Sequence, residues 1–255
     1  MIERISREDR ESLKRFFPGT GDVLLLSALE GFTGRAFESR DGAAAIVVSR
    51  GFVFLGGQAK EAFFRRAAAY LPDCFLTFRG SPAWLRIARR CGASVAMTRY
   101  EMAAPERFDE ALLRRLAHPP EGFVLKTADE SVYRDCLSAP WSEDLASFYS
   151  DAASFVRDDL VFAAYRDGEL AAGCGVYART ADAVEIEIDT RESFRRMGLA
   201  TCCAAAFLLR CVQRGLTPHW DAMTPISRAL AMKLGFADPR PYQVVCREEI
   251  HGSRR

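Results

Sequence analysis

The segment from residue 184 to residue 214 restricts the fold more than any other part of the chain. Its first part, Val184–Thr190, alternates apolar residues with Glu and Asp, and this period of two predicts a half-buried strand. The stretch Gly198–Arg214 has the length and composition of a buried helix, and Gly215 after it is a typical helix end. A strand, a short polar turn and a helix in succession indicate an α/β arrangement.

The turn that joins these two elements has the properties of an anion-binding site. The first turn of a helix leaves N–H groups without partners and carries about half a positive charge. Gly198 lets the main chain approach a ligand closely, and Ala200 is also small. Arg195 and Arg196 add positive charge, so the pattern predicts a cradle for a diphosphate.

Strands and helices alternate along the rest of the chain. Hairpins are predicted around Arg50-Gly51 and around Asp167-Gly168. Each half shows the order hairpin, helix, strand, helix, strand, which indicates an internal duplication. The expected fold class is α/β (α+β), a mixed sheet flanked by helices, preceded by a smaller α/β half.

Three prolines mark the boundary between the halves. Pro105, Pro119 and Pro120 lie in a segment that also contains one short charged helix, Asp109–Ala117. The expected division is an N-terminal domain at residues 1–104, a linker at 105–120 and a second domain at 121–255.

The even charge balance excludes several classes of partner. The 255 residues include 35 Lys and Arg and 34 Asp and Glu, for a net charge of +1. Such a balance gives no general attraction to nucleic acid or anionic membranes. The apolar runs fall short of the ~20 residues that a membrane helix needs, and residues 1–10 lack the apolar core of a secretion signal. We expect a cytoplasmic protein whose eight cysteines are reduced and behave as small apolar residues.

Several familiar motifs are absent or out of context. No phosphate loop, Gly-x-Ser-x-Gly or His-Glu-x-x-His motif occurs, and His118, His219 and His251 are too scattered for a metal cluster, so no metal is expected. Gly173-Cys-Gly175 fits the letters of a dinucleotide motif, but it lies inside the second strand of a hairpin rather than before a helix. Small residues at such a place instead indicate a bulge or the close approach of another segment.

Two motifs in the second half resemble those of the GNAT N-acetyltransferase superfamily. Arg195-x-x-Gly198-x-Ala200 matches the superfamily's Arg/Gln-x-x-Gly-x-Gly/Ala motif, which starts a helix after a strand. Leu234-Gly235-Phe236 matches the motif that closes the next helix. The strand Glu185–Thr190 and the segment Trp220-Asp221-Ala222 look most like the zwittermicin-resistance-type branch. The resemblance covers about residues 121–247, and the first half looks like a degenerate copy of the same fold in which no cofactor is expected.

The resemblance implies acetyl-CoA as the cosubstrate and assigns residues to it. The strand before the turn would bind the pantetheine arm through its main chain, and the N–H groups of the turn would bind the diphosphate. The thioester would lie in the gap between Val184–Thr190 and Pro218–Met223, with a main-chain N–H near Asp189 polarising its carbonyl. The implied cofactor-binding residues are Ile188, Asp189, Thr190, Arg195, Arg196, Met197, Gly198, Leu199, Ala200 and Thr201.

The implied reaction also needs a group that removes a proton from the attacking amine. Glu185 and Glu187 are two residues apart and therefore point to one face of the strand, which makes them the candidate catalytic residues. A carboxylate in a partly dry cleft can have a raised pKa and accept a proton. Two alternatives stay open: these residues form only the polar face of the strand, or His219 on the next strand is the base.

Two departures from the superfamily pattern concern the leaving thiolate. Many members have a Tyr three residues before the Leu-Gly-Phe motif, where this chain has Ala231. The usual Asn at the head of the same helix is Thr224 here. The proton donor would then be Tyr242, Ser227 or water.

These implications lead to an acetyl-CoA-dependent N-acetyltransferase that modifies the primary amine of a small molecule by direct attack. The departures keep open a second hypothesis, a non-catalytic regulatory module that binds acyl-CoA, and a third is protein N-acetylation. No nucleic acid or membrane partner is expected. The first half either shapes the acceptor cleft or forms a homodimer interface.

Overall fold

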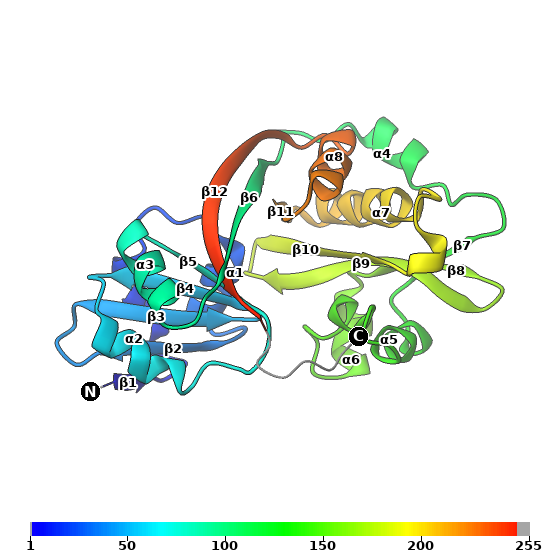
Figure 1. Cartoon of the computed structure of the whole chain (residues 1–255). Helices are drawn as coiled ribbons and strands as arrows, with labels where there is room; N and C mark the ends of the chain where they lie inside the picture. The colour runs from blue at the N-terminus through cyan, green and yellow to red at the C-terminus, as the bar shows by residue number, and fades with distance from the viewer. Residues whose placement is uncertain (1, 249–255) are drawn as a thin grey trace. The chain divides into compact units, whose positions relative to one another are not determined.

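The chain folds into two α/β units, each a mixed sheet flanked by helices (Figure 1). The computed structural model describes residues 2–248. Unit 1 comprises the described residues up to Arg99 together with those from Pro241 onward, and unit 2 comprises Tyr100–Arg240. The expected fold class is confirmed.

Unit 1 contains the predicted hairpin, helix, strand and helix, preceded by elements that the sequence did not predict. The additional elements are the strands β1 (Ile2–Ile5) and β2 (Arg35–Ser39) and the 3₁₀ helix η1 (Arg10–Phe16). The remaining elements are α1 (Val23–Leu29), β3 (Ala44–Ser49), β4 (Phe52–Gly57), α2 (Glu61–Ala68), β5 (Leu76–Gly80), α3 (Pro82–Arg90) and the first part of β6 (Val95–Ala103).

Unit 2 follows the predicted order with one correction. The sequence pattern of residues 142–155 predicts one continuous helix. The structure instead has the 3₁₀ turn η2 (Glu143–Leu145) and an irregular stretch, and a new helix starts only where Asp151 caps it. The other elements are α4 (Glu110–Leu116), β7 (Val124–Thr127), α5 (Glu130–Leu137), α6 (Ala152–Asp158), β8 (Phe162–Arg166), β9 (Glu169–Arg179), β10 (Ala183–Thr190), η3 (Glu192–Phe194), α7 (Leu199–Arg214), β11 (Thr217–Ala222), α8 (Pro225–Lys233) and the start of β12 (Ala237–Arg247).

The two sheets have the same topology. The strand order is β1-β2-β3-β4-β5-β12 in unit 1 and β7-β8-β9-β10-β11-β6 in unit 2. Each sheet contains one parallel pair, β4 with β5 or β10 with β11, and one helix, α2 or α7, joins the two strands of that pair. This equivalence supports the internal duplication that the order of elements indicates.

The last strand of each half completes the sheet of the other unit. In unit 1, Val245–Arg247 of β12 pair antiparallel with Leu76–Phe78 of β5. In unit 2, Tyr100–Met102 of β6 pair antiparallel with Trp220–Ala222 of β11. The duplicated halves have therefore exchanged their final strands.

This exchange makes the observed division differ from the expected one. The sequence places residues 121–255 in one domain, whereas the described residues 241–248 belong to unit 1. The expected linker 105–120 differs as well, because Phe108 and Leu113 in it are buried in the core of unit 2. The prolines and charges of this segment predict a linker and do not reveal the burial. The few apolar residues of the segment are enough to anchor it in the core of unit 2.

Short polar side chains start most of the helices. The carboxylates of Asp22, Asp109 and Asp129 each accept the N–H three residues further on, at 3.0, 3.0 and 2.8 Å. Ser81 and Thr224 cap α3 and α8, and a proline follows each of them at the first helical position. The long helix α7 differs, because its N-cap residue is a glycine and no side chain caps it.

Helix α7 lies on one face of the unit 2 sheet, and α5 and α6 lie on the other (Figure 1). Small residues such as Cys203, Ala204 and Ala205 are completely buried along α7, which lets the helix pack close to the strands. All eight cysteines are free thiols, and burial raises the pKa of Cys202 to about 11. Between residues 2 and 248, no helix combines the length and the hydropathy that a membrane span needs.

A substitution in β12 should destabilise the N-terminal unit, although it lies near the end of the chain. Val245 is 1% exposed, and Val245→Ala is expected to lower the free energy of unfolding by about 2 kcal/mol. Val124 is 57% exposed, so Val124→Ala is a matched control with a change below about 0.5 kcal/mol. Urea unfolding gives the magnitude, and hydrogen exchange should show lost protection in β4 and β5. Loss of protection in unit 2 alone would contradict the exchanged-strand arrangement.

Candidate functional site

Strands β10 and β11 are parallel but separate after a short pairing. In the described part of the chain the ladder between them covers Ala183–Glu185 and Thr217–His219. Beyond this point β10 continues to Thr190 and pairs with β9. Among the described residues the ladder to β11 does not extend to Ile188–Thr190, and this is where the resemblance implies a gap between the strands.

Glu185 lies where the two strands separate. Its Oε1 accepts the main-chain N–H of Asp221 at 3.0 Å, and the residue is only 8% exposed. The side chain thus ties β11 to β10 at the end of the main-chain ladder. This contact gives Glu185 a structural role in the separation of the strands.

Gly173 and Gly175 let another segment pack directly on β9. A Cβ on Gly175 would lie 2.7 Å from the carbonyl oxygen of Leu145, and one on Gly173 would lie 2.6 Å from Leu145 Cδ1. Any side chain at either position would collide with η2. These glycines therefore permit a close approach, as their place inside a hairpin strand predicts.

Glu187 and Asp189 project to the face of the sheet that η2 covers. Glu187 is opposite Gly175 and Asp189 is opposite Gly173 in the antiparallel pair of β10 and β9. Directly opposed residues share a face, so both carboxylates lie on the side of Leu145. Glu187 Oε1 also accepts the N–H of Ile188 at 3.2 Å, so one main-chain donor expected to bind the cofactor arm donates to a side chain.

The Asp189 carboxyl is the titratable group that the sequence analysis missed. Its pKa is raised to about 6, mainly by burial and also by the negative charge of Asp144, while the positive charge of Arg195 opposes both. The sequence assigned only the main chain of this residue. The alternation of acidic residues shows which face Asp189 occupies, but its burial depends on η2, whose position the sequence does not reveal.

The turn before α7 presents a row of main-chain N–H groups. Arg196 and Gly198 have φ angles of 65° and 83°, and Gly198 is the N-cap residue of a 16-residue helix. Among the described residues none accepts a hydrogen bond from the N–H groups of residues 196–201. Arg195, Arg196 and Met197 are exposed around them. The predicted cradle therefore has both free donors and positive charge.

The corresponding strand end in unit 1 is filled. A Cβ on Gly198 would meet only Pro120 Cγ at 3.8 Å, so the space beside the unit 2 turn is open. In unit 1 a Cβ on Gly56 would lie 2.6 Å from the Phe17 ring, and one on Gly57 would lie 2.4 Å from the carbonyl oxygen of Ala43. The two halves share a topology but differ at the place where a cofactor would bind.

Trp220 and Ala231 belong to the core of unit 2. The Trp220 ring packs edge-on against Phe236, and its Nε1 donates to Ser227 Oγ at 3.0 Å. Ala231 is completely buried, so this position offers no proton donor. His219 is the neighbour of Glu185 across the short parallel ladder and is partly exposed.

Tyr242 lies in unit 1, where the Arg79 guanidinium stands 4.0 Å from its ring centre. It is therefore not among the residues that unit 2 brings together. Within residues 2–248, no group of three or more His, Cys, Asp or Glu side chains has the arrangement of a metal site. His251 lies outside the described residues.

Comparison with known proteins gives consistent matches. A family model described as GNAT acetyltransferase matches residues 14–245. The solved structure of a GCN5-related N-acetyltransferase-like protein from Streptococcus suis 89/1591 is 31% identical with a TM-score of 0.82, and the match covers 93% of this chain and 98% of that one.

Two further relatives are more distant. The chain is 29% identical over 129 residues to the Bacillus subtilis (strain 168) protein "Uncharacterized N-acetyltransferase YdfB", a match that covers 49% of this chain and 48% of the relative. The chain thus spans about half the length of the curated relative it matches. A tandem GNAT protein from the clavulanic acid biosynthesis pathway, solved without AcCoA, shares the fold with a TM-score of 0.58 at 14% identity over 96% of this chain and 97% of that one.

Proposed function

The chain belongs to the GNAT acetyltransferase family, and from this premise we propose that it is an acetyl-CoA-dependent N-acetyltransferase acting on the primary amine of a small molecule. The observation that carries the proposal is the turn at residues 196–201, where main-chain N–H groups have no acceptor among the described residues. A diphosphate supplies the acceptors and the negative charge that this turn lacks.

The residues of unit 2 fit the cosubstrate in three places. The N–H groups of residues 196–201 would hold the diphosphate, and the Arg195 and Arg196 side chains would add charge-assisted contacts. The Arg195 N–H, which the resemblance also assigns to the diphosphate, donates to the Glu192 carbonyl oxygen at 3.3 Å. The main chain of Ile188–Thr190, which pairs with β9 but lies beyond the ladder to β11, would hold the pantetheine arm on the β11 side. The Ile188 N–H, which donates to Glu187 in this structure, would be released as a donor to the arm. When bound, the cosubstrate supplies an acetyl group activated as a thioester.

The acidic face of β10 supports an amine as the acceptor. Glu187, Asp189 and nearby Asp144 place negative charge on the η2 side of the sheet, which favours a protonated amine. The amine must then lose a proton before its nitrogen forms the new C–N bond as the thioester C–S bond breaks. We propose Asp189 as the group that accepts this proton, with Glu187 beside it and Glu185 holding the strands.

A second candidate function, a module that binds acyl-CoA without catalysis, is favoured by one observation. The position that carries a Tyr in many superfamily members is the buried Ala231, so the leaving thiolate takes its proton from water or Ser227 in an active enzyme. Single-turnover assays separate the two functions, because a binding module retains the thioester whereas an enzyme releases free thiol.

Thermal unfolding tests the cosubstrate. Acetyl-CoA is expected to raise the midpoint of unfolding, since a ligand that binds only the folded state stabilises it. NAD and ATP serve as controls that also carry a diphosphate, and they should raise the midpoint less. A mass-spectrometric screen with pooled small amines and basic peptides then identifies the acceptor class. The absence of any shift with acetyl-CoA would exclude both the enzyme and the binding module.

Gly198→Ala should weaken acetyl-CoA binding about tenfold. The added Cβ lies beside the N–H groups of the turn, and alanine disfavours the φ of 83° that the main chain has at this position. Gly215→Ala is the matched control at the other end of α7, where φ is 65° and a Cβ meets no atom within 4 Å. Both variants should lose about 1 kcal/mol of stability. Calorimetric titration should show lost affinity for Gly198→Ala alone, and equal affinities would contradict a main-chain cradle.

Several finer assignments are part of the same proposal. The likeness of Trp220-Asp221-Ala222 to the zwittermicin-resistance-type branch supports a small, polar acceptor. Unit 2 would carry the chemistry, and unit 1 would serve as a degenerate partner that shapes the acceptor site or a homodimer interface. A cytoplasmic location and a reaction without a metal ion complete the proposal.

A further inference from the structure

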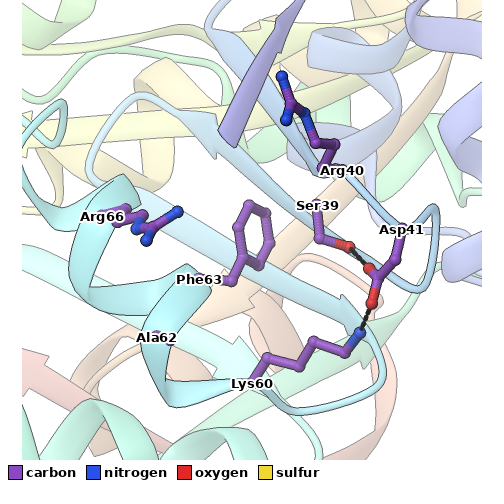
Figure 2. Close-up of a pocket in the computed structure, with 7 residues that line it drawn as sticks. All are labelled: Ser39, Arg40, Asp41, Lys60, Ala62, Phe63 and Arg66. Atoms are coloured by element: carbon purple, nitrogen blue, oxygen red, sulfur yellow. Dashed lines mark hydrogen bonds and ion pairs between the residues drawn. The ribbon is translucent and has the colours of Figure 1, made fainter. Parts of the chain in front are cut away.

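Unit 1 contains a cavity of about 350 Å³ at the start of α2 (Figure 2). The cavity lies between the end of β2 and the first two turns of the helix. Figure 2 shows the Phe63 ring in its wall, with Arg66 on one side and Ser39 on the other. Its lining residues are Ser39, Arg40, Asp41, Lys60, Ala62, Phe63 and Arg66.

The acidic residues near the cavity are already engaged. Asp41 accepts hydrogen bonds from Ser39 Oγ at 2.8 Å and from Lys60 Nζ, and these contacts lower its pKa to about 2. Glu61, the first residue of α2, accepts hydrogen bonds from Arg65 and Arg90, neither of which lines the cavity. The carboxylates therefore do not neutralise the remaining cations of the lining.

Two arginines of the lining have no such partner. Arg40 and Arg66 are both exposed, and within residues 2–248 neither forms an ion pair or a side-chain hydrogen bond. Lys60 and Asp41 cancel one another, so the lining residues that the structure describes carry an excess of two positive charges. Unpaired guanidinium groups around a concave surface are suited to a dianion.

The start of α2 adds donors to this charge. Its N-cap residue is Lys60, whose ammonium group cannot accept a hydrogen bond, and no side chain caps the helix. The N–H groups of Ala62 and Phe63 in the first turn are therefore available beside the lining side chains. In the duplicated topology α2 corresponds to α7, which begins at the turn of residues 195–201. The cavity at the start of α2 therefore has the same place in unit 1 as that turn has in unit 2.

We propose that this cavity binds the phosphate group of a small molecule through Arg40, Arg66 and the first-turn N–H groups of α2. The volume lies at the lower end of the range for small-molecule sites, which suits free phosphate or a compact phosphate ester. The filled strand end at Gly56 and Gly57 excludes an extended pantetheine arm here. Unit 1 is then a ligand-binding unit in its own right, independent of the proposed acetyl transfer.

Amide-detected NMR of the full chain tests the site with inorganic phosphate, glucose 6-phosphate and uncharged glucose, at constant ionic strength set with chloride. Phosphate and the ester, but not glucose, should shift the signals of Ala62 and Phe63. The double variant Arg40→Gln with Arg66→Gln should weaken this binding at least tenfold. Arg86 and Arg89 are also exposed arginines of unit 1 but do not line the cavity, so Arg86→Gln with Arg89→Gln is the matched control.

The outcomes separate the possible ligands from an adventitious ion. Tighter binding of the ester than of phosphate identifies a phosphorylated molecule, and equal binding identifies the free anion. Shifts that persist in the Arg40 and Arg66 double variant, or that are absent at Ala62 and Phe63 at millimolar phosphate, would overturn the site. Acetyl-CoA affinity should be unchanged in the double variant, so the result does not depend on the proposed enzyme.

Discussion

Replacing Asp189 by asparagine is expected to lower kcat by about 10²–10⁴-fold, the usual contribution of a positioned general base. Burial raises the pKa of the Asp189 carboxyl to about 6, so the group is mostly ionised, and able to accept a proton, at neutral pH. Glu185 is bonded to the main chain of β11, and Glu187 is bonded to the adjacent Ile188 N–H. Asp189 is thus the carboxylate on this strand whose environment best suits proton transfer.

The pH dependence of kcat/KM distinguishes a base from a structural carboxylate. Activity of the wild-type chain should fall below pH about 6, because protonation of Asp189 removes the acceptor. The residual activity of Asp189→Asn should lose this acid limb, whereas Glu187→Gln should keep it. If the limb disappears in Glu187→Gln and persists in Asp189→Asn, the base is Glu187, one of the two candidates that the sequence predicts.

The free energy of unfolding gives an independent check, because Asp189→Asn is expected to raise stability at pH 8 while it lowers activity. The folded-state pKa of Asp189 lies above the ordinary value of 3.8, so the folded state binds the proton more tightly than the unfolded state does. The ionised carboxylate therefore destabilises the fold above pH about 6, and this penalty disappears below pH about 4. Asp189→Asn should be more stable than the wild type at pH 8 and similar to it at pH 4. A variant that is both less active and less stable at pH 8 would indicate a structural role.

The free N–H groups of the turn at residues 196–201 could be predicted from sequence because the features that produce them are local. Gly198, Arg195 and the strand-to-helix context lie within a short segment, and the free N–H groups follow from the geometry of any helix start. The close packing at Gly173 and Gly175 is predictable for the same reason, since their place inside a hairpin strand excludes a helix start and indicates a close approach.

Features that depend on contacts between distant segments could not be predicted. The pKa of Asp189 depends on η2, which lies more than forty residues away in the sequence, and residues 142–155 have a helical pattern that the packing of Leu145 on Gly175 overrides. The exchanged strands are a second case. The apolar alternation of β12 predicts a strand, but nothing in it specifies whether β5 or β11 is its neighbour.

Replacing Arg195 and Arg196 together by glutamine is expected to weaken acetyl-CoA binding about 10²-fold, since each charge-assisted contact contributes about 1.5–3 kcal/mol and exposure reduces both. The wild-type affinity should fall as salt rises, and the double variant should show a smaller salt dependence. Arg134 and Arg157 are exposed arginines of unit 2 outside the turn, so Arg134→Gln with Arg157→Gln is the matched control. Calorimetric titration that shows equal affinities in the two double variants would contradict a role for the turn.

The two arginines should differ in their effect on Asp189. The positive charge of Arg195 lowers the pKa of Asp189, whereas the negative charge of Asp144 raises it. Arg195→Gln should therefore move the acid limb of kcat/KM above pH 6, and Asp144→Asn should move it below pH 6. Arg196 has no such influence on Asp189, so Arg196→Gln should weaken binding and leave the limb in place. Opposite displacements in the first two variants would establish that the cofactor turn and the proton acceptor form one electrostatically coupled site, and an unmoved limb in both would separate them.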